Sequence, residues 1–149
     1  MNSHGPEYQA YQKLVRDHAT LKNLLDRIEQ TLTERSGTID QIGDLLGKLG
    51  DRLVKHFALE EDGGYFAEAL LHAPQLVSKA NSLLAQHPKM SQQAKTLVED
   101  LKSRPAAGEE WWQETKARFS AFRAELLRHE RSENGLLQEA YVRDLGAHD

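Results

Sequence analysis

Two pairs of side chains in the sequence have the spacing of metal ligands on a helix. His56 is followed four residues later by Glu60, and His129 is followed four residues later by Glu133. Residues four apart lie on the same face of a helix, so an imidazole nitrogen and a carboxylate oxygen can reach one ion. Acidic residues are frequent in this chain, and the spacing alone is therefore weak evidence. The positions of the pairs within the expected helices provide stronger evidence.

An all-α fold is expected, because leucine recurs at intervals of three and four and no segment alternates β-branched or aromatic residues as a strand would. The expected helices span about residues 8–34, 38–70, 74–101 and 109–144, with Thr38 as an N-cap and an uncertain passage at Gly63-Gly64. Trp111, Trp112, Phe119 and Phe122 are expected in the core. Short turns make neighbouring helices antiparallel, which predicts a single up-down-up-down four-helix bundle over residues 1–149, with flexible tails at 1–6 and 145–149.

Each of these helices carries one histidine that is expected at a common level of the bundle: His18, His56, His87 and His129. Residues on antiparallel neighbours lie level when they are equally far from the connecting turn. The midpoint of the first two histidines is Gly37, and that of the last two is Gly108, both in expected turns. An aliphatic residue three positions earlier places each histidine on an inward face: Val15, Leu53, Leu84 and Leu126.

Burying four imidazoles and two carboxylates at one level without a cation would cost kilocalories for each unpaired group. The expected metal ligands are therefore His18, His56, Glu60, His87, His129 and Glu133. The chain has no cysteine, so the ligands are nitrogen and oxygen. Six ligands exceed the four of a closed zinc site, which favours two ions with Glu60 and Glu133 as bridges.

The pattern resembles the hemerythrin-like family of HHE cation-binding domains, over nearly the whole chain. The motifs are Asp17-His18, His56-Phe57-x-x-Glu60, Gln86-His87 and His129-x-x-x-Glu133. The resemblance implies two iron ions (Fe2+/Fe3+) with an oxo or hydroxo bridge, zinc being a possible substitute. It further implies that the protein reacts with or senses dioxygen, peroxide or nitric oxide.

Respiratory hemerythrins carry two histidines four apart on the third helix, whereas the positions that flank His87 at this spacing are Leu83 and Ser91. The chain is therefore closer to bacterial proteins of the H-HxxxE-H-HxxxE type. Water, Glu61 or Tyr65 could fill the position that is left. Glu61 itself, about 100° around the helix from Glu60, is expected at the surface.

Pro88 disfavours helix at His87 and predicts a kink there. The other histidines, His4, His72 and His148, are expected in tails or a turn and are given no role.

Charge and hydropathy exclude several classes of protein. Lys and Arg number 19 and Asp and Glu 23, a net charge of −4 with both signs interspersed, so no nucleic-acid partner is expected. Neither a signal peptide nor a membrane span is evident, and we expect a cytoplasmic protein whose partner is a diatomic or peroxide ligand. Whether it is an enzyme stays open. The alternatives are a metal-stabilised helical sensor or interaction module, for which zinc is a candidate metal, and a metal-free structural bundle.

Overall fold

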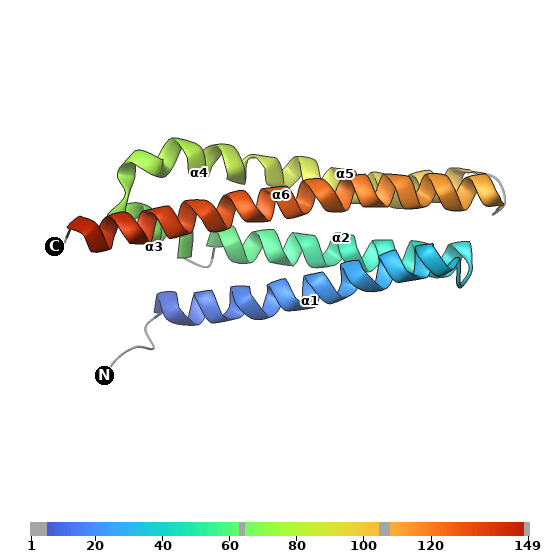
Figure 1. The fold of residues 1–149 in the computed structure, drawn as a ribbon, viewed down its shortest axis with the longest axis horizontal. Helices are drawn as coiled ribbons and strands as arrows, with labels where there is room; N and C mark the ends of the chain where they lie inside the picture. The colour runs from blue at the N-terminus through green and yellow to red at the C-terminus, as the bar shows by residue number, and fades with distance from the viewer. Residues whose placement is uncertain (1–5, 63–64, 105–107, 148–149) are drawn as a thin grey trace.

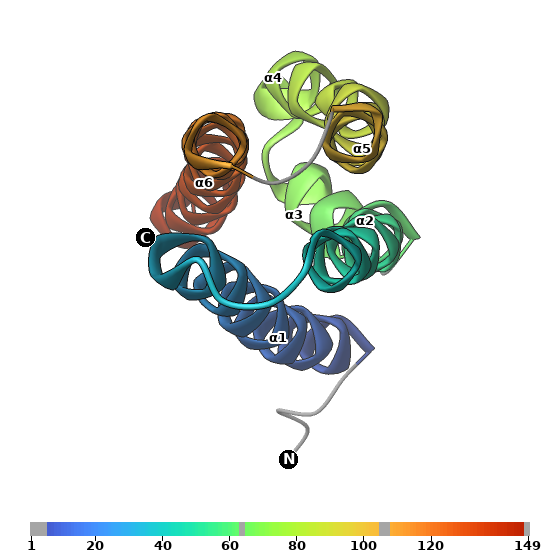
Figure 2. The ribbon, with the colours of Figure 1, turned by 90° about the vertical axis from the view of Figure 1, so that its right-hand side faces the viewer.

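The structure, a computed structural model, describes residues 6–62, 65–104 and 108–147. Within these residues the fold is an antiparallel bundle of long helices, which confirms the all-α prediction (Figure 1). Helix α1 (Pro6–Glu34) runs to the Gly37 turn and α2 (Ile39–Asp62) returns beside it. Helix α5 (Gln86–Ser103) leads to the second turn at the same end, and α6 (Glu109–Ala147) runs back along the whole bundle. Viewed from that end, these four helices surround a common interior (Figure 2).

Three short elements close the opposite end: α3 (Tyr65–His72), the 3-10 turn η1 (Pro74–Leu76) and α4 (Val77–Leu84). The second predicted helix is described as two elements, α2 up to Asp62 and α3 from Tyr65, and the passage at Gly63-Gly64 lies outside the described residues. Helix α6 extends to Ala147, three residues into the segment expected to be a tail. Of the predicted tails and third turn, residues 1–5, 148–149 and 105–107 likewise lie outside the description.

The third predicted helix is interrupted before Pro88 rather than at it. Helix α4 ends at Leu84, and α5 begins at Gln86. Pro88 thereby falls in the first turn of a new helix, where backbone N–H groups have no partner within the helix and a missing one costs little. The predicted kink is real, but it lies at Ala85, because a break there accommodates the proline without losing a helical hydrogen bond.

The turn between α1 and α2 has a defined local structure. Arg35 and Gly37 have positive φ angles of 53° and 91°, and the Ser36 N–H donates to the Thr31 carbonyl at 3.1 Å. The Thr38 N–H donates to Gln41 Oε1 at 2.8 Å, and the Gln41 N–H donates to Thr38 Oγ1 at 3.2 Å. These reciprocal bonds are a capping box, which confirms Thr38 as the N-cap. The φ of 91° at Gly37 is a conformation that residues with a Cβ rarely adopt, so glycine is favoured there.

Thr38→Ala should lower the free energy of unfolding by about 1 kcal/mol, because the Gln41 N–H loses its acceptor. Thr33→Ala, at an exposed position in the last turn of α1, is the matched control and should change stability by less than about 0.5 kcal/mol. Urea denaturation of both variants measures the difference. Equal midpoints for the two would show that the cap does not stabilise the bundle.

Two apolar clusters fill the interior. The larger joins α1, α2, α5 and α6 on the side of the Gly37 turn, and includes the predicted core residues Trp111, Phe119 and Phe122, with Trp112 packed at its edge. The smaller joins α3, η1, α4 and the second half of α6. Along α6, Leu126 belongs to the first cluster and Leu136 to the second. The buried residues between them, His129, Glu130 and Glu133, are all polar, so a polar layer separates the clusters. No helix in the described part of the chain is long and apolar enough to cross a membrane.

Candidate metal centre

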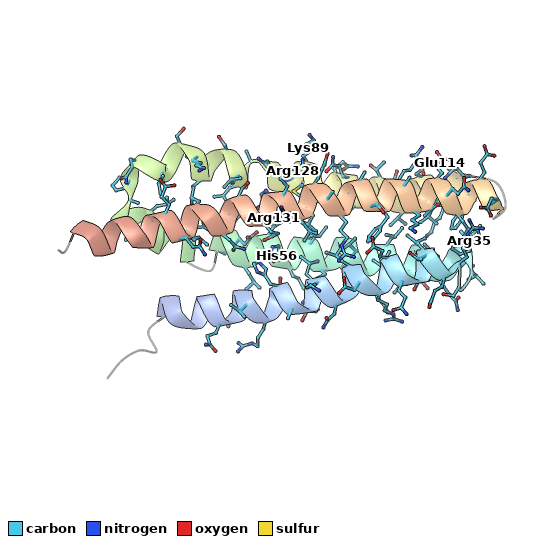
Figure 3. All side chains as sticks on the ribbon, viewed as in Figure 1. Arg35, His56, Lys89, Glu114, Arg128 and Arg131 are labelled. Carbon is cyan, nitrogen blue, oxygen red and sulfur yellow. The ribbon has the colours of Figure 1, made fainter. Side chains whose placement is uncertain are left out.

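The polar layer contains side chains from all four long helices. The structure brings together every predicted ligand: His18 of α1, His56 and Glu60 of α2, His87 of α5, and His129 and Glu133 of α6. His56 is seen in the middle of the bundle, away from both ends (Figure 3). The side chains of His56, His87 and His129 are 0–3% exposed, whereas that of His18 is 30% exposed.

These residues form two groups, of which the first lies between α1, α2 and α6. It consists of His18, His56, Glu60 and Glu130, each offering one atom within 4.8 Å of the others. Glu130 spans the two histidines, with Oε1 2.6 Å from His56 Nε2 and Oε2 3.1 Å from His18 Nε2. Glu60 Oε1 lies 3.3 Å from His56 Nε2.

The second group lies between α2, α5 and α6 and consists of Glu60, His87, His129 and Glu133. Glu133 Oε2 lies 3.0 Å from His87 Nε2 and 3.1 Å from His129 Nε2. The two Nε2 atoms are 3.1 Å apart, and Glu60 Oε1 lies 3.4 Å from that of His87. The same Glu60 oxygen therefore borders both groups.

The donor atoms fit bound metal ions. Two donors at right angles around an ion, each at about 2.1 Å, lie about 3 Å apart, which is close to the observed separations. Several of these buried atoms also lack a hydrogen bond: His18 Nε2, Glu60 Oε1, Glu130 Oε2 and Glu133 Oε1. Unpaired buried polar atoms are costly, and a cation between them would satisfy them together. Imidazole and carboxylate donors suit iron and zinc.

The structure divides the carboxylates differently from the prediction that Glu60 and Glu133 both bridge. Glu60 borders both groups, but Glu133 belongs to the second group alone, and Glu130 holds the corresponding place in the first. Glu130 was not predicted, because it has no histidine four residues away. The available signal was its position next to His129, since adjacent helical residues point about 100° apart and can face different neighbouring helices.

Three of the histidines donate a hydrogen bond from Nδ1, the ring nitrogen that faces away from the donor groups. His56 Nδ1 donates to Asp17 Oδ2 at 2.7 Å, His87 Nδ1 to Glu61 Oε2 at 2.6 Å, and His129 Nδ1 to Gln86 Oε1 at 2.8 Å. Each acceptor is the chain neighbour of a predicted ligand on another helix. Such bonds fix the tautomer and leave Nε2 free to face an ion.

The expectation that Glu61 lies at the surface is confirmed, since its side chain is 46% exposed, but its carboxylate also contacts the site through His87. It does not face the metal side of that ring, since it binds Nδ1 while the group forms around Nε2. The Tyr65 side chain lies outside the described part of the structure.

The aliphatic residue three positions before each histidine is expected to face inward, and it does so on two helices. Leu53 and Leu126 are fully buried, as predicted, but Val15 is 48% exposed. Figure 1 shows the N-terminal half of α1 diverging from its neighbours, which leaves Val15 in solvent and His18 partly so. Leu84 lies in α4, before the break at Ala85, and so does not share a helix face with His87.

In the metal-free protein, burial and neighbouring charges shift the pKa values of the side chains in this site. Burial lowers the pKa of His56, but hydrogen bonds to Asp17 and Glu130 outweigh it and raise the pKa to about 10. Burial also lowers the pKa of His87, but the carboxylates of Glu133, Glu60 and Glu61 outweigh this effect and raise the pKa to about 10.

The remaining groups shift in different directions. Burial raises the pKa of Glu60 to about 8. Burial also acts to raise the pKa of Glu130, but the adjacent imidazoles of His18 and His56 prevail and lower it to about 2. Burial lowers the pKa of His129.

The metal-free protein should lose stability between pH 6.5 and 10. The raised pKa values of His56 and His87 contribute stability that is complete below 6.5 and disappears as pH rises through about 10. The raised pKa of Glu60 acts in the same direction through about pH 8. The lowered pKa of His129 acts oppositely, but chiefly below pH 6.5.

Thermal denaturation with a chelator, across this pH range, checks the prediction. Bound metal should reverse the slope between pH 6.5 and 8, because its ligands must be deprotonated. His87→Gln, which removes one of the two raised groups, should flatten the metal-free profile. A chelated protein that gains stability towards pH 10 would contradict the assignment.

The fold and site define a metal-binding helical bundle, with paired groups of His and Glu side chains in its interior. The family model of the hemerythrin HHE cation binding domain matches residues 9–145. The chain therefore belongs to the hemerythrin HHE cation-binding domain family. Neither the curated proteins nor the solved structures gave a significant match.

Proposed function

We propose that the protein is a non-haem di-iron protein that reacts with or senses dioxygen, peroxide or nitric oxide. The observation that carries the proposal is the position of Glu60, whose Oε1 lies 3.3 Å from His56 Nε2 in one group and 3.4 Å from His87 Nε2 in the other. A carboxylate between two histidine-containing groups is suited to bridging two ions.

The two groups provide a complete set of protein ligands. His18, His56 and Glu130 would hold one ion, His87, His129 and Glu133 would hold the other, and Glu60 would contact both. The proposed cofactor is a pair of iron ions with an oxo or hydroxo bridge. Four protein ligands for each ion leave about two of six octahedral positions for this bridge and a small molecule. When bound, paired iron ions supply electron exchange with small oxygen and nitrogen species.

The first group lies nearer to solvent than the second, although its donor atoms His18 Nε2 and Glu130 Oε2 are buried. The side chains of His18 and Glu130 are 30% and 12% exposed. In the second group, His87, His129 and Glu133 are 3% exposed or less, and Glu60 is 1% exposed. A small molecule is therefore expected to approach the centre from the His18 side, where the least protein covers it.

The composition of each group favours a second candidate function. Each group alone offers four nitrogen and oxygen donors, enough for tetrahedral zinc. Ions of this kind would stabilise the bundle without redox chemistry, as in a metal-stabilised helical sensor or interaction module.

Anaerobic loading with Fe2+, followed by exposure to dioxygen, hydrogen peroxide or nitric oxide, separates the two candidates. The di-iron proposal predicts about two Fe2+ per chain and a new visible or near-ultraviolet absorption with at least one of these molecules. His56→Ala should abolish the spectral change, while Glu99→Ala, at an exposed position of α5, should retain it. Iron that raises the melting temperature but gives no spectral change with any of the three would favour the module.

A further inference from the structure

His87 is held by two side chains of α2 that lie outside both donor groups. Its ring stacks on Phe57, with centroids 4.0 Å apart and planes inclined by 8°, and its Nδ1 donates to Glu61 Oε2 at 2.6 Å. Phe57 and Glu61 are four residues apart and so lie on one face of α2, next to the face that carries His56 and Glu60. One helix thus supplies both the Glu60 donor and the support for a histidine on α5.

The bond to Glu61 determines how His87 can act. With a proton on Nδ1, the lone pair of the neutral ring is on Nε2. That nitrogen lies 3.0 Å from Glu133 Oε2 and 3.1 Å from His129 Nε2, where the second group forms. Phe57 fixes the plane of the ring, and Glu61 fixes its tautomer.

Glu61 differs from the other two Nδ1 acceptors in charge. Asp17 lies 3.4 Å from Arg52, which compensates its carboxylate, and Gln86 is neutral. Among the described residues no Lys or Arg pairs with Glu61, whose one recorded partner is His87. The three carboxylates of the donor groups carry three negative charges, and Glu61 adds a fourth. Two divalent ions carry four positive charges, which the three donor carboxylates do not balance by themselves, so the Glu61 carboxylate adds favourable negative charge beside the centre.

We propose that Glu61 is a positioning residue of the second ion. It orients His87 and adds the negative charge that strengthens cation binding at His87, His129 and Glu133. This inference rests on the proposed pair of ions, but it assigns to Glu61 a role that neither the bridge nor the donor groups require. An outer hydrogen-bond partner of this kind typically contributes 10- to 100-fold to metal affinity.

Co2+ titration of the metal-free protein tests the proposal without relying on redox activity. The wild type should bind about two Co2+ per chain. In Glu61→Leu, one of the two ions should bind about 10- to 100-fold more weakly while the other is unchanged. Glu61→Gln should fall between them, because the amide oxygen accepts the Nδ1–H bond but carries no charge. Asp62→Asn removes a neighbouring exposed charge and should leave both affinities unchanged.

A spectroscopic signature distinguishes this role from a general effect on folding. In the NMR spectrum of the Co2+-loaded protein, the shifted N–H signal of one histidine should exchange faster with water in Glu61→Leu, and Glu61→Gln should restore it. Thermal unfolding verifies that the metal-free variants are folded.

Each outcome of the titration is decisive. Equal behaviour of Glu61→Leu and Asp62→Asn, or equal weakening of both ions, would overturn the role of Glu61 while leaving the two-ion site intact. If the wild type binds fewer than two Co2+ per chain, the proposed two-ion site is contradicted, and the role of Glu61 falls with it.

Discussion

Glu60→Gln is expected to destroy paired metal binding, with the affinity for the second ion falling at least about 100-fold. Losing a ligand should exceed the 10- to 100-fold cost of losing an outer hydrogen-bond partner. Glutamine keeps the size of the side chain, but a neutral amide cannot serve two cations as a carboxylate can. Competition with a chromophoric chelator measures the loss, and Glu99→Gln provides the control at an exposed site on α5.

The same substitution should have the opposite effect on the metal-free protein. Burial raises the pKa of Glu60 to about 8, so at pH 9 the folded protein holds a buried ionised carboxylate that is more favourable in the unfolded chain. An amide has no such cost, and metal-free Glu60→Gln should be at least as stable as the wild type at pH 9. A variant that bound two ions as tightly as the wild type would exclude Glu60 as the bridge.

Phe57→Ala should lower the free energy of unfolding of the metal-free protein by about 3–5 kcal/mol. Phe57 is 3% exposed, and it packs within the larger apolar cluster. Its ring also stacks on His87 and meets His129 edge-on, with centroids 6.0 Å apart. The substitution should therefore also weaken binding of the second ion, because the ring of His87 is free to rotate.

Phe119→Ala is the matched control, since Phe119 is fully buried in the same cluster and, among the described residues, its ring does not stack on a histidine of the donor groups. It should cost similar stability while leaving the intrinsic metal affinity of the folded protein unchanged. Denaturant unfolding gives the first quantity and Co2+ titration the second. If Phe57→Ala does not fold, Phe57→Leu keeps most of the volume and still removes the stacked ring. Equal affinities in the Phe57 and Phe119 variants would show that stacking does not position His87.

The level of the histidines could be predicted from the sequence because it depends on counting alone. Antiparallel helices joined by short turns align residues that are equally distant from the turn, and this reasoning brought His18 to His56 and His87 to His129. The local rules for caps were equally reliable at Thr38, where the side chains that form the capping box are three residues apart.

Features that depend on the rotation and tilt of helices could not be predicted in this way. Glu130 and Glu61 each stand beside a predicted ligand, and only the rotation of their helices decides that one faces the first group and the other faces Nδ1 of His87. Val15 is exposed because α1 diverges from the bundle, which no periodicity within α1 reveals. Pro88 correctly indicated that the third helix is interrupted in this region, but the interruption lies at Ala85 rather than at His87.

The central claim is that two ions lie on either side of Glu60. Anomalous diffraction at the iron absorption edge, from crystals of the iron-loaded protein, tests it most directly. The account predicts two peaks about 3.5–4 Å apart, one beside His18, His56 and Glu130 and the other beside His87, His129 and Glu133. A single peak, or ions bound away from Glu60, would contradict it.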